Sequence, residues 1–307
     1  MSFAFVFPGQ GSQSVGMMQA YGESAVVRDT FTEASDILKQ DLWKLVTDGP
    51  AEEINQTVNT QPLMLTAGVA VWRLWNSLGG KQPSAMAGHS LGEYTALVAA
   101  GAIAFADAVP LVRFRAEAMQ SAVPEGVGAM AALLGLEDDV VRAVCAEAAQ
   151  GEVLEAVNFN SPGQVVIAGN KAAVERGAEI AKAKGAKRAL LLPVSVPSHC
   201  ALMKPAGDAL ADYLKNITVA APAIPVWHNA DVAAHNDAAA IKDALVRQLY
   251  SPVRWVETVQ AFVANGLVQV VECGPGKVLA GLNKRIDSAV QAVALADISS
   301  IEQLVKE

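Results

Sequence analysis

The fold of this chain is decided by the stretch Ala85-Met86-Ala87-Gly88-His89-Ser90-Leu91-Gly92-Glu93-Tyr94. The small and apolar residues up to Gly88 predict a short buried strand, and the apolar spacing from Leu91 onward predicts a helix. Ser90 lies at the joint between two glycines, in the pattern G-x-S-x-G. The strand before the pattern and the helix after it favour a nucleophile elbow, a strained turn that exposes a serine hydroxyl. The alternative is a glycine- and serine-rich turn without chemistry.

The expected position of Ser90 suits attack on a carbonyl group. At a helix N-terminus, unpaired N–H groups and the helix dipole favour negative charge. An oxyanion formed by attack would be stabilised there, and the backbone N–H of Leu91 is the expected donor. The loop Pro8-Gly9-Gln10-Gly11, which follows a predicted first strand, could supply a second N–H from Gln10.

A serine hydroxyl is a weak nucleophile at neutral pH, so it needs a base within hydrogen-bond reach. Among the four histidines, His199 is the strongest candidate, because Pro197-Ser198 presents it on an extended loop just before a predicted helix. No aspartate or glutamate is identified by its position as a third triad member. We therefore expect a dyad in which a backbone carbonyl orients the imidazole. The weaker candidates are His89, expected to point away from Ser90, and His228 and His235, expected in a loop.

The chain length of 307 residues is near the upper size of one hydrophobic core, so a large domain with a smaller inserted one is expected. Residues 128–194 read as strand, helix, strand, strand, helix and strand, the order of a ferredoxin-like unit. Outside that unit, strands alternate with helices, which indicates a largely parallel sheet. The predicted fold is α/β, with a hydrolase-like large domain of residues 1–126 and 197–307 and an inserted ferredoxin-like domain of residues 127–196.

The predicted strands are 3–7, 85–88, 128–135, 153–159, 164–168, 187–194, 224–227, 267–272 and 291–296. The predicted helices are 61–78, 137–150, 171–184, 201–215, 237–250, 253–265 and 277–286, with helical spacing also within 17–48 and from Asp107 onward. That last stretch is apolar apart from two arginines, Arg113 and Arg115. One of them is expected to be carried inward, where an arginine is costly unless a carboxylate meets it.

Composition excludes several classes of protein. A net charge of -8 argues against general nucleic-acid binding. The chain shows neither a signal peptide nor an uninterrupted membrane span, so we expect a soluble, cytoplasmic protein that does not bind membranes. Three separated cysteines, Cys145, Cys200 and Cys273, indicate neither a disulfide framework nor a metal site.

Two glycine-rich turns could suggest a bound nucleotide. Gly9-x-Gly11 lacks the third glycine of a dinucleotide fingerprint, and Gly274-Pro275-Gly276-Lys277 lacks the earlier glycine and the following hydroxyl residue of a P-loop. No cofactor is expected.

Seven stretches together resemble the malonyl-CoA:acyl carrier protein transacylase family of bacterial fatty acid synthesis, in order and as far as about residue 287. They are Phe7-Pro8-Gly9-Gln10-Gly11-Ser12-Gln13, Gly88-His89-Ser90-Leu91-Gly92-Glu93, Arg115 after Asp107-Ala108, Asn158-Phe159-Asn160-Ser161-Pro162, Pro197-Ser198-His199, Arg247-Gln248-Leu249-Tyr250 and Gly274-Pro275-Gly276-Lys277.

This resemblance implies a ping-pong acyl transfer with malonyl-CoA and acyl carrier protein as partners. A serine would take malonyl from CoA as an ester, and the phosphopantetheine thiol of the carrier would then collect it. The implied roles are Ser90 as nucleophile, His199 as base, the main-chain carbonyl of Gln248 as the group that holds the imidazole, Gln10 and Leu91 as the oxyanion hole, and Arg115 as the ligand of the free carboxylate.

Other functions share parts of this pattern. The nearest alternative is a serine thioesterase or hydrolase of acyl-CoA, and two others are a non-catalytic docking module and a polyketide acyltransferase domain. Because acyl carrier proteins are acidic, a basic docking cluster is also expected. The candidates are Lys182, Lys184, Lys187 and Arg188, which would otherwise be a solvated helix end.

Overall fold

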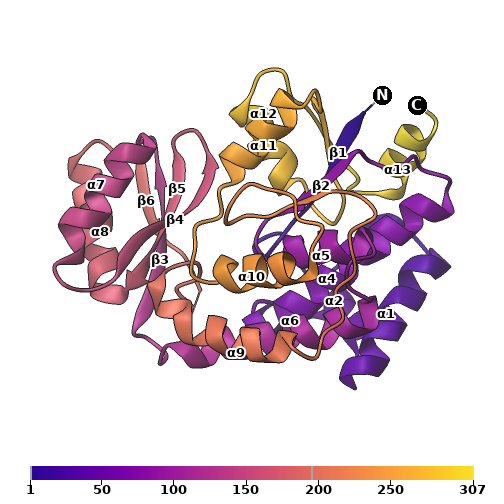
Figure 1. The fold of residues 1–307 in the computed structure, drawn as a ribbon, viewed down its shortest axis with the longest axis horizontal. Coiled ribbons are helices and arrows are strands. Elements are labelled where there is room, and N and C mark those ends of the chain that lie inside the picture. The colour runs from indigo at the N-terminus through magenta and orange to yellow at the C-terminus, as the bar shows by residue number, and fades with distance from the viewer. Residues whose placement is uncertain (1, 195) are drawn as a thin grey trace.

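The computed structural model describes residues 2–194 and 196–307 (Figure 1). The described strands form two separate sheets. The larger sheet has the order β7-β2-β1-β8-β9, and all its neighbouring strands are parallel, which confirms the expected largely parallel sheet. Its members are β1 (Phe3–Phe7), β2 (Ala85–Gly88), β7 (Val226–Trp227), β8 (Gln269–Glu272) and β9 (Gln291–Ala294).

Helices cover both faces of this sheet. Successive side chains of a strand point to opposite faces, so β1 contributes to a hydrophobic core on each face. Phe5 of β1 packs edge-on against Trp72 and Trp75, with ring centroids 5.8 and 5.3 Å away, in the core of one face. Its neighbour Val6 belongs to a second core on the other face. The first core includes α1 (Ala25–Leu38), α4 (Thr57–Ser77), α5 (Gly92–Ala99) and α6 (Phe105–Ala122), and the second includes α11 (Trp255–Ala264) and α12 (Val278–Ile286).

The smaller sheet has the order β4-β5-β3-β6, and each neighbouring pair is antiparallel. Figure 1 shows it at the left, with α7 (Asp138–Ala149) and α8 (Lys171–Ala183) on its outer side. On the other face of this sheet, Met130 and Val166 belong to a small hydrophobic core together with Cys200, the residue that follows His199. Its members are β3 (Gly128–Leu134), β4 (Leu154–Ser161), β5 (Gln164–Asn170) and β6 (Arg188–Leu191).

Several element bounds differ from the prediction. Helix α4 begins at Thr57, four residues before the predicted start at Gln61, and α6 begins at Phe105, two residues before the predicted start at Asp107. Strand β6 ends at Leu191, two residues before Pro193, which lacks a backbone donor. The remaining elements are η1 (Gln19–Tyr21), α2 (Leu42–Asp48), α3 (Ala51–Ile54), η2 (Ala201–Met203), α9 (Lys204–Leu214), α10 (Ala238–Gln248) and α13 (Ile298–Val305).

Helix α13 was not predicted. Its N-cap Asp297 accepts from the backbone N–H of Ser300, and the Ser300 hydroxyl faces the N–H of Asp297, which makes a capping box. Among residues 2–194 and 196–307, no helix combines the length and the apolar character that a bilayer crossing needs.

Candidate active site

Ser90 lies in the tight turn between β2 and α5, with a φ of 52° in the left-handed region. A β-carbon on Gly88 would lie 1.8 Å from the carbonyl carbon of Gly92, and one on Gly92 would lie 2.0 Å from the main-chain oxygen of Phe7. Only glycine therefore allows β1, β2 and α5 to approach this closely. The left-handed backbone of a non-glycine residue costs about 1–3 kcal/mol, so the surrounding packing must hold the serine in place.

Asn229, in the loop after β7, forms hydrogen bonds to the backbone on both sides of this turn. Its Oδ1 accepts from the backbone N–H of Ser90 at 2.7 Å, and its Nδ2 donates to the main-chain oxygen of Gly88 at 2.7 Å. Asn229 is fully buried. Sequence reasoning missed it, because nothing in the local pattern of a loop asparagine indicates a partner 139 residues away.

The structure brings Ser90, His199 and Gln248 together. Ser90 Oγ lies 2.8 Å from His199 Nε2, and His199 Nδ1 lies 2.8 Å from the main-chain oxygen of Gln248. Because a carbonyl oxygen can only accept, Nδ1 must carry the ring proton, which leaves Nε2 free to accept from the serine hydroxyl. The arrangement can deprotonate a serine as it attacks a carbonyl group.

Arg115, from α6, is the arginine that the fold carries inward, and it is 1 % exposed. Its Nη1 donates to Gln61 Oε1 at 2.9 Å, and its Nη2 donates to Gln248 Oε1 at 2.9 Å and to Ser90 Oγ at 3.3 Å. These partners are neutral, so no carboxylate of the described residues forms a hydrogen bond or ion pair with the buried arginine. A buried guanidinium whose contacts are all neutral is suited to binding an anionic group from outside.

Electrostatics favour the neutral imidazole. Burial, followed by the positive charge of Arg115, lowers the pKa of His199 to about 3, although the hydrogen bond to Gln248 acts in the opposite direction. Burial also lowers the pKa of Arg115. His199 is therefore in its proton-accepting form at neutral pH, and an anion bound at Arg115 would offset the charge that lowers its pKa.

A cleft between the two sheets contains these groups, and its cavity volume is about 120 Å³. Pockets that enclose a whole drug-sized ligand are typically about 300–1,000 Å³, so this cleft has room for only the reacting end of a larger molecule. The large-sheet side of its lining includes Gln10, Ser90, Leu91, Arg115 and His199, and the small-sheet side includes Met130, Asn158, Leu192 and Val194.

Gln10 and Leu91 lie on two loops that pack together beside Ser90. A β-carbon on Gly9 would lie 2.3 Å from the main-chain oxygen of His89 and 3.6 Å from the backbone nitrogen of Leu91. Within the described ranges, neither the Gln10 nor the Leu91 backbone N–H donates to another group of the chain. Both amides are thus available to a ligand in the cleft.

The other histidines have partners elsewhere. Their ring nitrogens lie within hydrogen-bond distance of other side chains: His89 Nε2 is 2.8 Å from Asn160 Oδ1, His228 Nδ1 is 2.7 Å from Glu93 Oε1 and His235 Nε2 is 3.0 Å from Asp231 Oδ2. All three cysteines are buried, and burial raises the pKa of the Cys200 thiol to about 12. In the part of the chain that the structure describes, no group of histidine, cysteine or acidic residues is placed to hold a metal ion.

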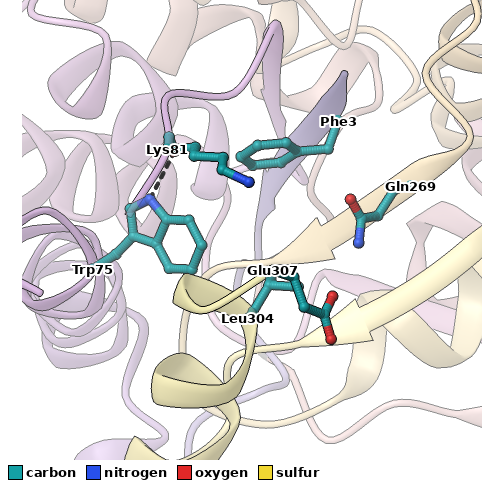
Figure 2. A pocket seen from close by; sticks show the side chains of 6 residues that line it. All are labelled: Phe3, Trp75, Lys81, Gln269, Leu304 and Glu307. Carbon is teal, nitrogen blue, oxygen red and sulfur yellow. Dashed lines mark hydrogen bonds between the residues drawn. The ribbon is translucent and has the colours of Figure 1, made fainter. Parts of the chain in front are cut away.

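A second cavity, of about 340 Å³, lies at the amino-terminal ends of the strands of the large sheet, where β1 and β8 begin. Figure 2 shows its apolar wall, formed by Phe3, Trp75 and Leu304. Its polar lining consists of Lys81, Gln269 and Glu307. These side chains include no serine, cysteine or histidine, and Ser90 follows the other end of β2, so this cavity does not contribute to the site.

Comparison with known proteins gives consistent results. The model of the family described as "Acyl transferase domain" matches residues 4–302. The malonyl CoA-acyl carrier protein transacylase of Salmonella typhimurium is 59% identical over 300 residues, which cover 97% of each chain. That of Bacillus subtilis is 43% identical over 305 residues, 99% of this chain and 96% of the relative.

Solved structures match equally well. The acyl-carrier-protein S-malonyltransferase from Burkholderia pseudomallei 1710b is 64% identical, with a TM-score of 0.98 and all of each chain covered. A structure described as a type II PKS acyl-carrier protein in complex with its malonyl-transacylase is 55% identical, with a TM-score of 0.98, covering 100% of this chain and 99% of the other. The chain belongs to the acyl transferase domain family and, within it, to the malonyl CoA-acyl carrier protein transacylases.

Proposed function

We propose that this chain moves a malonyl group from malonyl-CoA to the phosphopantetheine thiol of an acyl carrier protein, for fatty acid chain elongation. The observation that carries this proposal is the position of Ser90 Oγ, 2.8 Å from His199 Nε2 and 3.3 Å from the guanidinium of Arg115. A nucleophile, its base and a cation that can bind a carboxylate thus meet at one point. Family membership supports the same substrate and acceptor.

In the first half-reaction, Ser90 Oγ attacks the thioester carbonyl while His199 Nε2 accepts the hydroxyl proton. The negative oxygen of the tetrahedral intermediate accepts from the backbone N–H groups of Gln10 and Leu91. The carbon–sulfur bond then breaks, and the CoA sulfur leaves with the proton that His199 returns. General base and acid catalysis of this kind contributes about 10²- to 10⁴-fold in rate.

The second half-reaction runs the same steps in reverse. The carrier thiol gives its proton to His199 and attacks the malonyl ester, and the carbon–oxygen bond to Ser90 breaks. The Ser90 oxygen then regains the proton from His199. The main-chain oxygen of Gln248 keeps the imidazole in one tautomer through both halves, which makes the two proton transfers equivalent.

Arg115 accounts for selectivity. Its guanidinium would pair with the free carboxylate of malonyl, the group that acetyl lacks. With acetyl in the cleft the buried cation would remain without an anion, a loss of about 1–3 kcal/mol. The preference for a carboxylated acyl group would therefore be set by a side chain that contacts the far end of the substrate.

The two sheets suggest two domains. A hydrolase-like large domain would comprise residues 1–126 and 197–307, and a ferredoxin-like domain residues 127–196, of which residue 195 lies outside the described residues. The small sheet supports this division, because its strand order β4-β5-β3-β6 and its antiparallel pairing are those of a β-α-β-β-α-β unit. A cytoplasmic location remains a prediction.

The test is the mass of the intact enzyme after incubation with malonyl-CoA. We expect a malonyl adduct in the wild type and none in Ser90→Ala, and we expect the adduct to disappear when an acyl carrier protein with its phosphopantetheine arm is added. Free malonate is measured in parallel. An adduct that releases malonate as fast without carrier as with it would instead identify a thioesterase, and a wild type that forms no adduct would overturn the proposal.

A further inference from the structure

Glu93 is a fully buried acid in the first turn of α5, within hydrogen-bond distance of the Gln248 side chain. Its carboxylate accepts three hydrogen bonds: from His228 Nδ1 at 2.7 Å, from the backbone N–H of Asn229 at 2.8 Å and from Gln248 Nε2 at 2.9 Å. The side chain does not line the cleft, so it does not contact a substrate there. The catalytic steps above do not use it.

The side chain of Gln248 connects Glu93 to the site. Gln248 Nε2 donates to Glu93 and to the main-chain oxygen of Ser90 at 3.0 Å, while Gln248 Oε1 accepts from Arg115. The main-chain oxygen of Gln248 also accepts from His199. Gln248 thus holds His199, the proposed base, through its backbone. Through its side chain it holds Arg115, which is proposed to bind the substrate's carboxylate.

The orientation of this amide matters, because its two ends have opposite hydrogen-bonding roles. If the amide of Gln248 were flipped, its NH₂ group would face the guanidinium of Arg115, and two donors would oppose each other. The carboxylate of Glu93 accepts only, so it keeps the NH₂ end on its own side and the oxygen toward Arg115. The dipole of the amide also points its negative end at the buried cation and its positive end at the buried anion.

We propose that Glu93 is a positioning residue for malonyl selectivity, which acts by fixing the amide of Gln248 and, through it, the guanidinium of Arg115. This inference rests on the proposed function, since it assumes that Arg115 binds the substrate's carboxylate. It assigns a role in substrate choice to a residue that is closed off from the substrate.

The main test is Glu93→Gln, which removes the charge and keeps the shape. The new NH₂ group can face His228 if that ring moves its proton to Nε2, an atom without a hydrogen-bond partner in the described chain. The new amide oxygen would then still accept from Gln248, as a neutral and weaker acceptor. We expect the ratio of kcat/KM for malonyl-CoA to kcat/KM for acetyl-CoA to fall by about fivefold, the difference between a charged and a neutral hydrogen bond.

Two further variants complete the design. Gln248→Met removes the amide but retains the backbone carbonyl that holds His199, so the ratio should fall at least as far, and adding Glu93→Gln to it should produce no further fall. Glu272→Gln is the control for replacing a buried acid elsewhere in the fold, because Glu272 is also fully buried, burial raises its pKa to about 7, and it accepts from the backbone N–H of Ala280. The ratio of this control should equal that of the wild type.

An equal loss for both substrates in Glu93→Gln would indicate a purely structural role and overturn the inference. A fall in the ratio that persists in full on the Gln248→Met background would also overturn it, because the effect would not pass through Gln248. If Glu93→Gln fails to fold, Gln248→Met alone decides, and an unchanged ratio overturns the inference. Failure of the proposed function is distinguishable, because the wild type would then form no malonyl adduct.

Discussion

Nδ1 of His199 donates to the main-chain oxygen of Gln248 over 2.8 Å, so a neutral carbonyl occupies the position that a carboxylate takes in a serine triad. A carbonyl fixes the tautomer and the orientation of the ring. It offers the protonated imidazole only a dipole, so this hydrogen bond raises the pKa of His199 less than burial and Arg115 lower it. The proton affinity of His199 therefore depends on whether an anion is bound to Arg115.

The first prediction concerns pH. Because the pKa of His199 is lowered from 6.5 to about 3, the imidazole stays neutral as the pH falls through the range in which a free histidine would be protonated. Acetyl transfer by the wild type should therefore lose no activity through protonation of this group near pH 6.5. Arg115→Ala removes the second-largest cause of the shift, so the pKa of His199 should rise and the acid limb should move to higher pH.

The measurement is the pH profile of kcat/KM for acetyl-CoA, which reports on ionisations of the free enzyme and needs no carboxylate contact. His89, whose pKa is lowered by burial, is present in both proteins and cancels from the comparison. Acid limbs that coincide in wild type and Arg115→Ala would show that the arginine does not control the base.

The second prediction concerns substrate choice. Arg115→Ala should lower kcat/KM for malonyl-CoA by about 10- to 100-fold, in line with a loss of about 1–3 kcal/mol, and should affect acetyl-CoA far less. Arg115→Lys keeps the charge but loses the planar fork of donors, so its preference should be intermediate. Both substrates are measured with the same carrier protein. A wild-type preference in Arg115→Ala would mean that another group binds the carboxylate.

The third prediction concerns the turn itself. A methyl group on Gly92 would lie 2.0 Å from the main-chain oxygen of Phe7, so Gly92→Ala should destabilise the fold by about 1–3 kcal/mol and displace Ser90. Gly281→Ala is the matched control, because no atom lies within 4 Å of the added carbon and the site is in the interior of α12. There alanine should stabilise by about 0.5–1 kcal/mol.

Chemical unfolding and malonyl transfer are measured for both variants. Equal stabilities of Gly92→Ala and Gly281→Ala would contradict the close approach of β1 and α5.

The sequence predicted the features that depend on local chemistry. The elbow depends on the glycines two positions before and after Ser90, and the loop with His199 depends on nearby prolines. Sequence reasoning missed Gln61 and Glu93, although Glu93 lies within the decisive stretch. Their roles arise where helices distant in sequence meet, and no local period encodes the partner of a buried polar side chain.

The predicted bounds of several helices and strands were wrong for related reasons. Helices α4 and α6 begin four and two residues earlier than predicted, at Thr57 and Phe105, and both residues are buried, so packing against the core extends each helix. Helix α13 could have been predicted, since the capping pair of Asp297 and Ser300 is visible in the sequence. Strand β7 is shorter than expected, with two residues in the sheet.

The last prediction concerns docking of the acidic carrier. In the expected basic cluster, Lys182 pairs with Glu179 and Lys184 pairs with Glu147, at 2.7 and 3.0 Å. Within residues 2–194 and 196–307, the other two members of the cluster form no ion pair. These are Lys187 and Arg188, and we expect the carrier to bind them.

The strand β6 leads from this pair toward the cleft. It runs from Arg188 to Leu191, and the next residue, Leu192, lines the cleft. At about 3.3 Å per residue, Arg188 lies about 13 Å along the strand from that lining. A carrier bound there could place its prosthetic arm at the cleft.

Reversing both charges with Lys187→Glu and Arg188→Glu should raise the KM for the carrier by about three- to tenfold at low salt, since each exposed pair contributes about 0.2–1 kcal/mol. The KM for malonyl-CoA in adduct formation should stay unchanged, and the carrier effect should shrink at high salt, where exposed charges are screened. The control is Lys81→Glu with Lys306→Glu, which makes the same change in net charge. Both residues are exposed and lie near the cavity where β1 and β8 begin. Equal carrier KM values for the two double variants would show that net charge, and not this cluster, attracts the carrier.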